Sequence, residues 1–175
     1  MSDAERPDIP ALAARLHDGH LDKAGAPYVT HLARVAAILK RRWPQASADE
    51  VAAAWLHDAL EDTAADEAAL VAEGVSAETV RIVRAVTRPE GSDYLAWIAA
   101  LADSGDIAVL RVKLADNEDN RDPARVAALP GAAERVATRY EPARALLEDG
   151  LARAMARRAA PRPAPDRDCP RCPPA

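Results

Sequence analysis

The sequence contains no phenylalanine, few aromatic side chains of any kind (3%), and only two cysteines among its 175 residues. Both cysteines, Cys169 and Cys172, lie close to the C-terminus, so disulfide bonds cannot hold a domain together. No apolar run approaches the roughly 20 residues that a membrane-spanning helix needs. The first residues also lack the basic and apolar segments of a signal peptide. These absences predict a cytoplasmic protein with no membrane partner.

The charge is distributed unevenly along the chain. The net charge is −5, but residues 151–175 carry six arginines against two aspartates, which leaves −9 for residues 1–150. Proteins that bind nucleic-acid backbones broadly need a basic surface, so we expect no nucleic-acid partner. An acidic body remains compatible with a small anionic substrate, because a bound metal ion changes the local field.

Apolar residues recur at helical spacing along most of the chain, and alanine supplies many of them. This pattern predicts an all-α bundle of about eight to ten helices, forming one domain over residues 1–158. Residues 107–120 contain enough valine and isoleucine to suggest a strand. The run exceeds ten residues and has no evident sheet partner, so a buried helix is the better interpretation.

Several helix ends are also predicted. Thr30 is a plausible N-cap for the second helix, and Trp43-Pro44 should end that helix. The third helix is expected to run without interruption to Thr63, and Pro142 should kink or split the last helical region.

Residues 159–175 are rich in proline and arginine and show no hydrophobic period, which is typical of a disordered tail. The tail holds a CxxC pair that could be half of a zinc site or a redox pair. No second CxxC and no βαβ pattern accompany it, so two incidental thiols are the favoured interpretation.

The stretch at residues 55–63, WLHDALEDT, places four hydrophilic groups at the end of an apolar run. On an uninterrupted helix His57 and Glu61 would lie one turn apart, as would Asp58 and Asp62. Such groups are costly among apolar neighbours unless something binds them, and a divalent metal ion is the first candidate. A capped helix end with a solvated acidic turn is the alternative, because a His-Asp pair alone is common.

Other parts of the chain offer partners for such an ion. His31 is expected in the first turn of the second helix, and Asp116 lies near the acidic end of the helix at 107–120, one turn from Asn120. Two imidazoles and two carboxylates suit Mn²⁺, Fe²⁺ or a similar ion better than a closed structural zinc site. Such an ion would make hydroxide available near neutral pH, and nearby carboxylates would orient or deprotonate the water.

Three segments in this order resemble the HD-domain metal-dependent phosphohydrolases, and in particular the hydrolase domain of RelA/SpoT proteins and the small alarmone hydrolases. The family pattern H-x-G-Q-x-x-K-x-G-x-P-Y-x-x-H is matched by HDGHLDKAGAPYVTH at residues 17–31. The pattern L-H-D-x-x-E-D-T is matched by LHDALEDT at 56–63, and K-L-A-D-x-x-x-N by KLADNEDN at 113–120. The resemblance covers about residues 10–150.

The resemblance implies a site and a reaction. One Mn²⁺ would be held by four side chains: His31, His57, Asp58 and Asp116. Glu61 and Asp62 match the catalytic pair that positions and activates water. The side chains that would contact a nucleotide substrate are Lys23, Asn120, Tyr140 and Arg135. The implied reaction removes the 3′-pyrophosphate from guanosine tetra- or pentaphosphate.

Two positions depart from the family pattern. Asp22 stands where the alarmone hydrolases usually have an arginine that packs on the guanine, and His20 replaces a glutamine. A carboxylate reverses the charge and cannot stack as a guanidinium does. Two alternatives therefore stay open: the same metal chemistry on another nucleotide or cofactor phosphate, such as NADPH, and a nucleotide-sensing module without turnover. The intact Glu61-Asp62 pair argues against the sensor.

Overall fold

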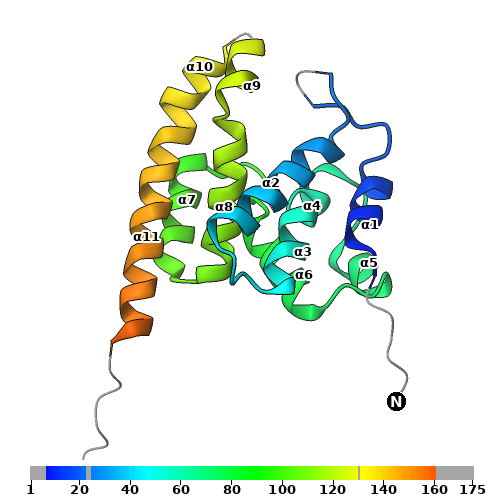
Figure 1. Ribbon diagram of the computed structural model, residues 1–175, viewed down its shortest axis with the longest axis horizontal. Coiled ribbons are helices and arrows are strands. Elements are labelled where there is room, and N and C mark those ends of the chain that lie inside the picture. The colour runs from blue at the N-terminus through cyan, green and yellow to red at the C-terminus, as the bar shows by residue number, and fades with distance from the viewer. Residues whose placement is uncertain (1–6, 23–24, 130, 161–175) are drawn as a thin grey trace, which may run out of the picture.

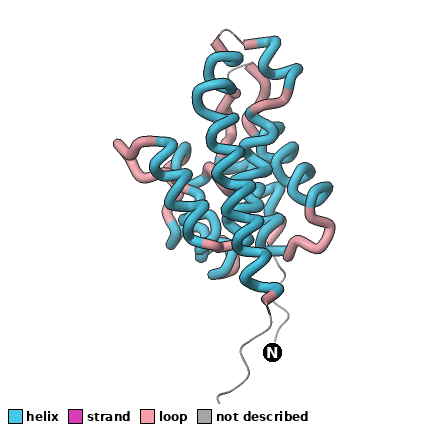
Figure 2. The backbone as a smooth tube through the Cα atoms, turned by 90° about the vertical axis from the view of Figure 1, so that its left-hand side faces the viewer, coloured by secondary structure: helices cyan, strands magenta, loops and turns pink. Residues whose placement is uncertain are grey.

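The computed structural model describes residues 7–22, 25–129 and 131–160, and within these ranges every regular element is helical (Figures 1 and 2). The prediction of an all-α fold is thereby confirmed. The described residues form nine α-helices of six residues or more, two single helical turns and one π-helical turn. The elements are α1 (Ile9–Leu16), α2 (Val29–Arg42), α3 (Ala48–Leu56), α4 (Ala59–Asp62), α5 (Glu67–Ala72), α6 (Ala77–Val86), α7 (Tyr94–Ser104), α8 (Ile107–Asn120), α9 (Pro123–Ala128), α10 (Ala132–Arg135), η1 (Val136–Tyr140) and α11 (Glu141–Ala159).

Helix α8 is the central element of the bundle (Figure 1). It packs against α2, α3, α6, α7 and α11, and ten of its side chains are buried. A helix that is enclosed on all sides cannot show an amphipathic pattern, which explains why its sequence resembled a strand. The prediction of a buried helix at residues 107–120 is confirmed, and Asp106 caps it by accepting hydrogen bonds from the N–H groups of Ala108 and Val109.

One predicted end of α2 is found and the other is not. Trp43 ends α2 as expected. The helix begins at Val29, with Tyr28 at the cap position, and the hydroxyl of Thr30 donates to the carbonyl of Pro27 at 2.8 Å. The prediction that Thr30 is the N-cap was therefore wrong, because its side chain satisfies a carbonyl of the preceding loop instead of a helical N–H group.

The third helix is interrupted at the functional stretch, and the prediction of a continuous helix to Thr63 was wrong. Helix α3 ends at Leu56, α4 starts at Ala59, and Asp58 between them has φ −100° and ψ 2°. His57 and Asp58 form this turn, and their contacts with Asp116 and Tyr28 outweigh the local preference for helix. The amide of Asp62 still donates to the carbonyl of Asp58 at 2.9 Å, so these two carboxylates do lie one turn apart.

The last helical region departs from regular α-helix directly before Pro142, although its helical turns are continuous. A π-helical turn, η1, directly precedes α11, and Pro142 occupies its first turn. Proline removes one backbone donor, and the wider π turn accommodates that loss. Helix α11 ends at Ala159, and the remainder of the predicted tail, with Cys169 and Cys172, lies outside the described residues.

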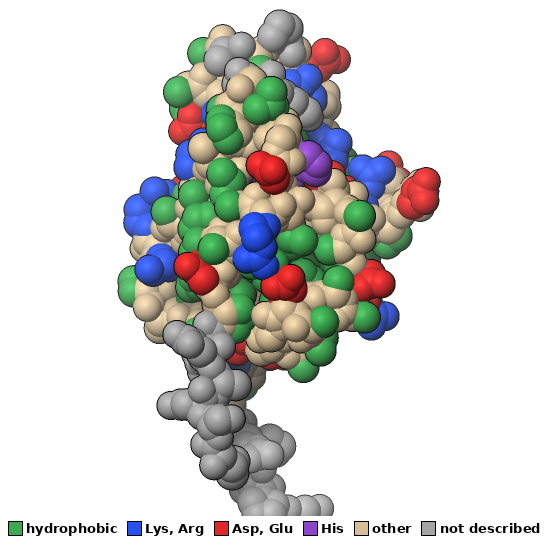
Figure 3. Space-filling model, turned by 90° about the vertical axis from the view of Figure 1, so that its right-hand side faces the viewer, with side chains coloured by type: hydrophobic (Ala, Val, Ile, Leu, Met, Phe, Trp, Pro, Cys, Tyr) green, Lys and Arg blue, Asp and Glu red, His purple; other side chains and the backbone are tan. Residues whose placement is uncertain are grey.

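The surface is mixed in character. The face on the right of Figure 1 carries single acidic and basic side chains scattered among apolar ones (Figure 3). Among the helices of the described ranges, none combines the length and the hydropathy that crossing a lipid bilayer would require.

Candidate active site

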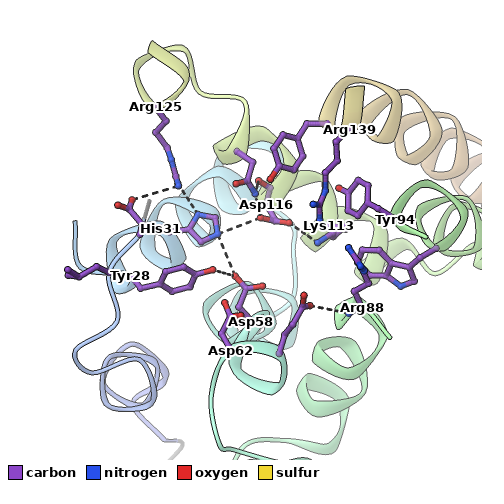
Figure 4. A pocket seen from close by; sticks show the side chains of 16 residues that line it. Tyr28, His31, Asp58, Asp62, Arg88, Tyr94, Lys113, Asp116, Arg125 and Arg139 are labelled. Carbon is purple, nitrogen blue, oxygen red and sulfur yellow. Dashed lines mark hydrogen bonds and ion pairs between the residues drawn. The ribbon is translucent and has the colours of Figure 1, made fainter. Parts of the chain in front are cut away.

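A cavity of about 330 Å³ opens between α2, the α3–α4 turn, α8 and η1 (Figure 4). Its wall contains most of the side chains that the sequence singled out. Those that line it are His31, Asp58, Glu61, Asp62, Asp116, Asn120 and Tyr140. His57 lies directly behind this wall and is fully buried.

The two imidazoles face the same two carboxylates. His31 Nε2 lies 3.7 Å from Asp58 Oδ2 and 3.5 Å from Asp116 Oδ1. His57 Nε2 lies 2.9 Å and 3.6 Å from the same two atoms. His31, His57 and Asp58 each offer one atom to a group whose members lie within 4.8 Å of one another. The structure thus brings together side chains from α2, the α3–α4 turn and α8 in a cluster that could hold a metal ion.

The orientation of the rings fits a metal ion. His31 Nδ1 lies 2.7 Å from Asp119 Oδ2, and His57 Nδ1 lies 3.0 Å from the carbonyl of Ala54. Both Nε2 atoms therefore point into the cluster. His57 Nε2 is buried and makes no hydrogen bond within the described part of the chain, although a carboxylate oxygen is close. A buried nitrogen in this situation is what a divalent ion with nitrogen and oxygen ligands would satisfy.

The cluster is strongly coupled electrostatically. Burial alone would lower the pKa of His57, but the nearby carboxylates of Asp58 and Asp116 raise that pKa to about 9. Burial opposes the same effect at His31, where the carboxylates of Asp116, Asp119 and Asp58 raise the pKa well above the usual value. Burial would raise the pKa of Asp58, and the charge of His57 holds it far below its usual range instead. A metal ion would take the place of these imidazolium protons.

Asp116 is held from two sides by residues of its own helix. Lys113 Nζ donates to Asp116 Oδ2 at 2.8 Å, and Asn120 Nδ2 donates to Oδ1 at 2.6 Å. Lys113 is buried and lies 4.8 Å from the centre of the Trp97 ring. Burial would lower the pKa of Lys113, but the charge of Asp116 keeps it above the usual value, so the lysine remains a cation.

Glu61 and Asp62 differ from the buried carboxylates in their surroundings. Both are exposed, lie on the single turn α4 and border the cavity. The carboxylate of Glu61 accepts a hydrogen bond from the backbone N–H of Arg88 at 3.2 Å. Their position next to the cluster and to solvent is one from which a carboxylate can reach a water molecule.

The four predicted substrate contacts are placed differently. Asn120 and Tyr140 line the cavity that contains the cluster, whereas Arg135 lines a smaller adjoining cavity. The arginine of this region that lines the cavity with the cluster is Arg139, whose guanidinium carbon lies 3.9 Å from the centre of the Tyr94 ring. Lys23 lies outside the described residues.

Sequence reasoning missed several groups around the cavity. Tyr28 donates from its hydroxyl to Asp58 Oδ2 at 2.6 Å, and Lys113 holds Asp116; both residues stand inside the quoted motifs. Three arginines, Arg88, Arg125 and Arg139, also line the cavity. They come from a loop, α9 and η1, where no periodic pattern indicates which way a side chain points.

Asp22, the departure from the family pattern, also lines the cavity. Its side chain is largely buried, accepts a hydrogen bond from the N–H of Ala26 at 3.0 Å, and lies 3.7 Å from Arg125 and 4.0 Å from Arg34. The carboxylate therefore borders two guanidinium groups.

Comparison with known proteins agrees with this geometry. A model of the HD domain matches residues 10–137. The chain is 33% identical over 123 residues to a GTP pyrophosphokinase of Myxococcus xanthus and 34% identical over 118 residues to a guanosine-3′,5′-bis(diphosphate) 3′-pyrophosphohydrolase of Haemophilus influenzae. Each match covers 62% of this chain but only 16% and 17% of the two relatives.

A solved structure has the same fold. It belongs to a metazoan orthologue of SpoT that hydrolyses ppGpp, and it superposes with a TM-score of 0.60 at 24% sequence identity, covering 86% of this chain and 93% of the other. The helical architecture, the imidazole–carboxylate cluster and the matched model lead to one conclusion. The chain belongs to the HD domain family.

Proposed function

We propose that this protein is a metal-dependent phosphohydrolase that removes the 3′-pyrophosphate of guanosine tetra- or pentaphosphate. The observation that carries the proposal is a single cavity that joins the imidazole–carboxylate cluster to Glu61 and Asp62. One relative is named for this hydrolysis and the other for GTP pyrophosphokinase activity, and the matches cover only a small part of each. The substrate is therefore inferred from the site together with the name of the pyrophosphohydrolase relative.

The proposed metal ion is Mn²⁺, with four side chains to hold it: His31, His57, Asp58 and Asp116. When bound, such an ion lowers the pKa of water and polarises a phosphoryl oxygen. Mixed nitrogen and oxygen donors support this choice of ion over a closed zinc site.

Charges on the cavity wall support an anionic substrate. With His31 neutral, as a metal ligand must be, the wall carries five carboxylates and four cationic side chains, so one divalent ion would change the sum from −1 to +1. Arg88, Arg139 and Lys113 lie on the side of the cavity facing α7 and η1 (Figure 4). Guanidinium groups bind phosphate oxygens in a forked geometry, so this side suits the phosphates of the substrate.

Glu61 and Asp62 supply the proton chemistry in this proposal. They orient a water molecule and accept its proton as the oxygen attacks phosphorus, and the bond between phosphorus and the 3′-oxygen breaks. The 3′-oxygen takes up a proton, and pyrophosphate leaves. General-base assistance of this kind contributes about 10²–10⁴-fold to a rate.

Asp22 favours a second candidate substrate class. A carboxylate at this place on the cavity wall cannot pack on guanine as the arginine of the family pattern does, and it can accept hydrogen bonds from a different group. The same chemistry on another nucleotide or cofactor phosphate, such as the 2′-phosphate of NADPH, is the runner-up. A nucleotide sensor without turnover is the third possibility.

The test is release of phosphate and pyrophosphate from a nucleotide panel with Mn²⁺ and after chelation. The panel contains guanosine tetraphosphate, NADPH and ordinary mono- and triphosphates. We expect pyrophosphate from guanosine tetraphosphate, abolished by chelation. Turnover of another panel member alone would change the assigned substrate but support the metal-dependent hydrolysis. Mn²⁺ binding without turnover of any panel member would refute the proposed enzymatic activity.

A further inference from the structure

Asp119 is a buried carboxylate that no part of the proposed reaction uses. It lies on α8 one turn beyond Asp116 and is 1% exposed. Its Oδ2 atom is 2.7 Å from His31 Nδ1, on the side of the ring that faces away from the cluster. It therefore contacts a proposed metal ligand from behind.

Two arginines hold this carboxylate in place. Arg34 of α2 donates from Nε to Asp119 Oδ1 at 2.6 Å, and Arg125 of α9 donates from Nη1 to Oδ2. Three helices thus meet at one carboxylate group. With two guanidinium groups as neighbours, Asp119 is an acceptor of hydrogen bonds.

The contact determines which ring nitrogen of His31 carries hydrogen. An ionised carboxylate only accepts, so a nitrogen 2.7 Å from it must be the Nδ1–H donor. Arg125 Nη1 also lies 3.2 Å from His31 Nδ1, but a guanidinium cannot accept a hydrogen bond, so the Nδ1 hydrogen goes to Asp119. In the neutral ring Nε2 therefore carries the lone pair, on the side that faces Asp58 and Asp116, where a metal ion would replace the imidazolium proton.

We propose that Asp119 is a positioning residue that fixes the tautomer and the orientation of His31 for metal binding, with Arg34 and Arg125 holding it in place. The inference rests on the metal site proposed above. A carboxylate that accepts from a metal-bound histidine makes the ring a better ligand, and removing such a partner typically costs about 10–100-fold in metal affinity.

The two histidines differ in this respect. His57 Nδ1 lies 3.0 Å from the backbone carbonyl of Ala54, a partner that no side-chain substitution removes. Replacing Asp119 should therefore weaken one ligand and leave the other intact, which gives a reduced affinity instead of a lost site.

The chain offers a matched control on the same helix. Glu118, next to Asp119, also pairs with two arginines, Arg41 and Arg42, but it does not line the active-site cavity. Glu118→Gln removes a carboxylate with two arginine partners without touching His31.

The experiment compares the affinities of the full chain, Asp119→Ala, Asp119→Asn and Glu118→Gln for Mn²⁺ and Zn²⁺ by chelator competition, with circular dichroism to confirm folding. We expect about a 10–100-fold loss in Asp119→Ala. A smaller loss is expected in Asp119→Asn, whose amide oxygen still accepts from Nδ1–H without the charge, and no change in Glu118→Gln. If Asp119→Ala does not fold, Asp119→Asn carries the comparison.

A second readout separates positioning from general destabilisation. In the zinc-loaded protein, NMR should show a slowly exchanging Nδ1–H proton on His31 that disappears in Asp119→Ala and persists in Glu118→Gln. Equal metal affinity and an unchanged proton signal in the Asp119 variants would overturn this inference while leaving the proposed hydrolase intact. Failure of the unsubstituted chain to bind either ion would instead overturn the metal site and the proposed function with it.

Discussion

Identical side-chain types acquire different roles at this site because their surroundings differ. Asp58 is enclosed by two imidazoles and the hydroxyl of Tyr28, whereas Asp62, one turn later, is exposed at the cavity edge. Enclosed carboxylates that stay ionised are suited to hold a cation. Exposed carboxylates beside the cavity are suited to exchange protons with water.

The separation of roles predicts the effect of Glu61→Gln. This change removes a proton acceptor but no proposed metal ligand, so turnover should fall by about 10²–10⁴-fold while Mn²⁺ affinity is retained. Steady-state kinetics and metal titration on the same sample measure the two quantities. Asp58→Asn is the contrasting variant and should lose both. Undiminished turnover in Glu61→Gln would show that another group accepts the proton.

At the scale of single elements, the end of α1 contains a buried histidine without a polar partner. His17 is 3% exposed, stacks on Tyr28 with ring centroids 5.0 Å apart, and neither ring nitrogen makes a hydrogen bond within the described part of the chain. Burial lowers its pKa below the usual value, and the nearby charge of Asp58 opposes that shift only in part.

The lowered pKa of His17 gives a signed dependence of stability on pH. Above about pH 6.5 the His17 ring is neutral in both the folded and the unfolded protein. Below that pH the unfolded chain binds a proton at this ring, whereas in the folded protein the ring stays neutral down to a lower pH. The free energy of unfolding should therefore decrease as the pH falls from about 7 to 5, by at most about 1.4 kcal/mol per pH unit from this residue. Urea unfolding of His17→Phe should show a shallower pH dependence than the unsubstituted chain. The exposed His20, changed to Gln, is the control, and an equal slope in His17→Phe would contradict the assignment.

Contact between α7 and α11 depends on one glycine. A Cβ atom at Gly150 would lie 2.6 Å from the carbonyl oxygen and 2.8 Å from the Cα of Ala102. Alanine normally stabilises a helix interior relative to glycine by about 1 kcal/mol. Here the backbone of α7 would have to move, and overpacking typically costs about 1–3 kcal/mol.

Gly150→Ala should accordingly lower the free energy of unfolding in spite of the gain in helix propensity. Denaturant unfolding measures the change. Ala152→Gly, at an exposed position of the same helix, shows the propensity effect alone and should cost about 1 kcal/mol. A Gly150→Ala variant more stable than the unsubstituted chain would show that α7 and α11 can separate at no cost.

At the scale of the whole molecule, the cluster connects segments that are distant in sequence. His31 on α2 and Asp116 on α8 are 85 positions apart in the sequence (116 − 31), and the α3–α4 turn contributes between them. An ion bound there would link three parts of the bundle in the folded state only. Binding to the folded state alone stabilises a protein by mass action.

Metal removal should therefore lower the unfolding temperature. An ion present at 100 times its dissociation constant adds about 2.7 kcal/mol to the free energy of unfolding. Thermal unfolding with Mn²⁺ and after chelation measures the difference, and Asp58→Asn should show a much smaller one. Identical unfolding temperatures with and without Mn²⁺ would argue against an ion at this site.

The sequence by itself determined the helical class, the buried course of α8, the irregular turn beside Pro142, and the order of motifs that carries the HD resemblance. These features depend on the periodicity of apolar residues and on hydrogen bonds between residues close in sequence. Both can be predicted from a short stretch of sequence. Only the tertiary structure decided that the third helix breaks at His57 and Asp58, that Thr30 turns to Pro27, and that Asp119 supports His31 from behind. It also decided that arginines from a loop, α9 and η1 share one cavity. The physical reason is that these arrangements arise from contacts between helices distant in sequence, and burial and charge pairing there outweigh local preference.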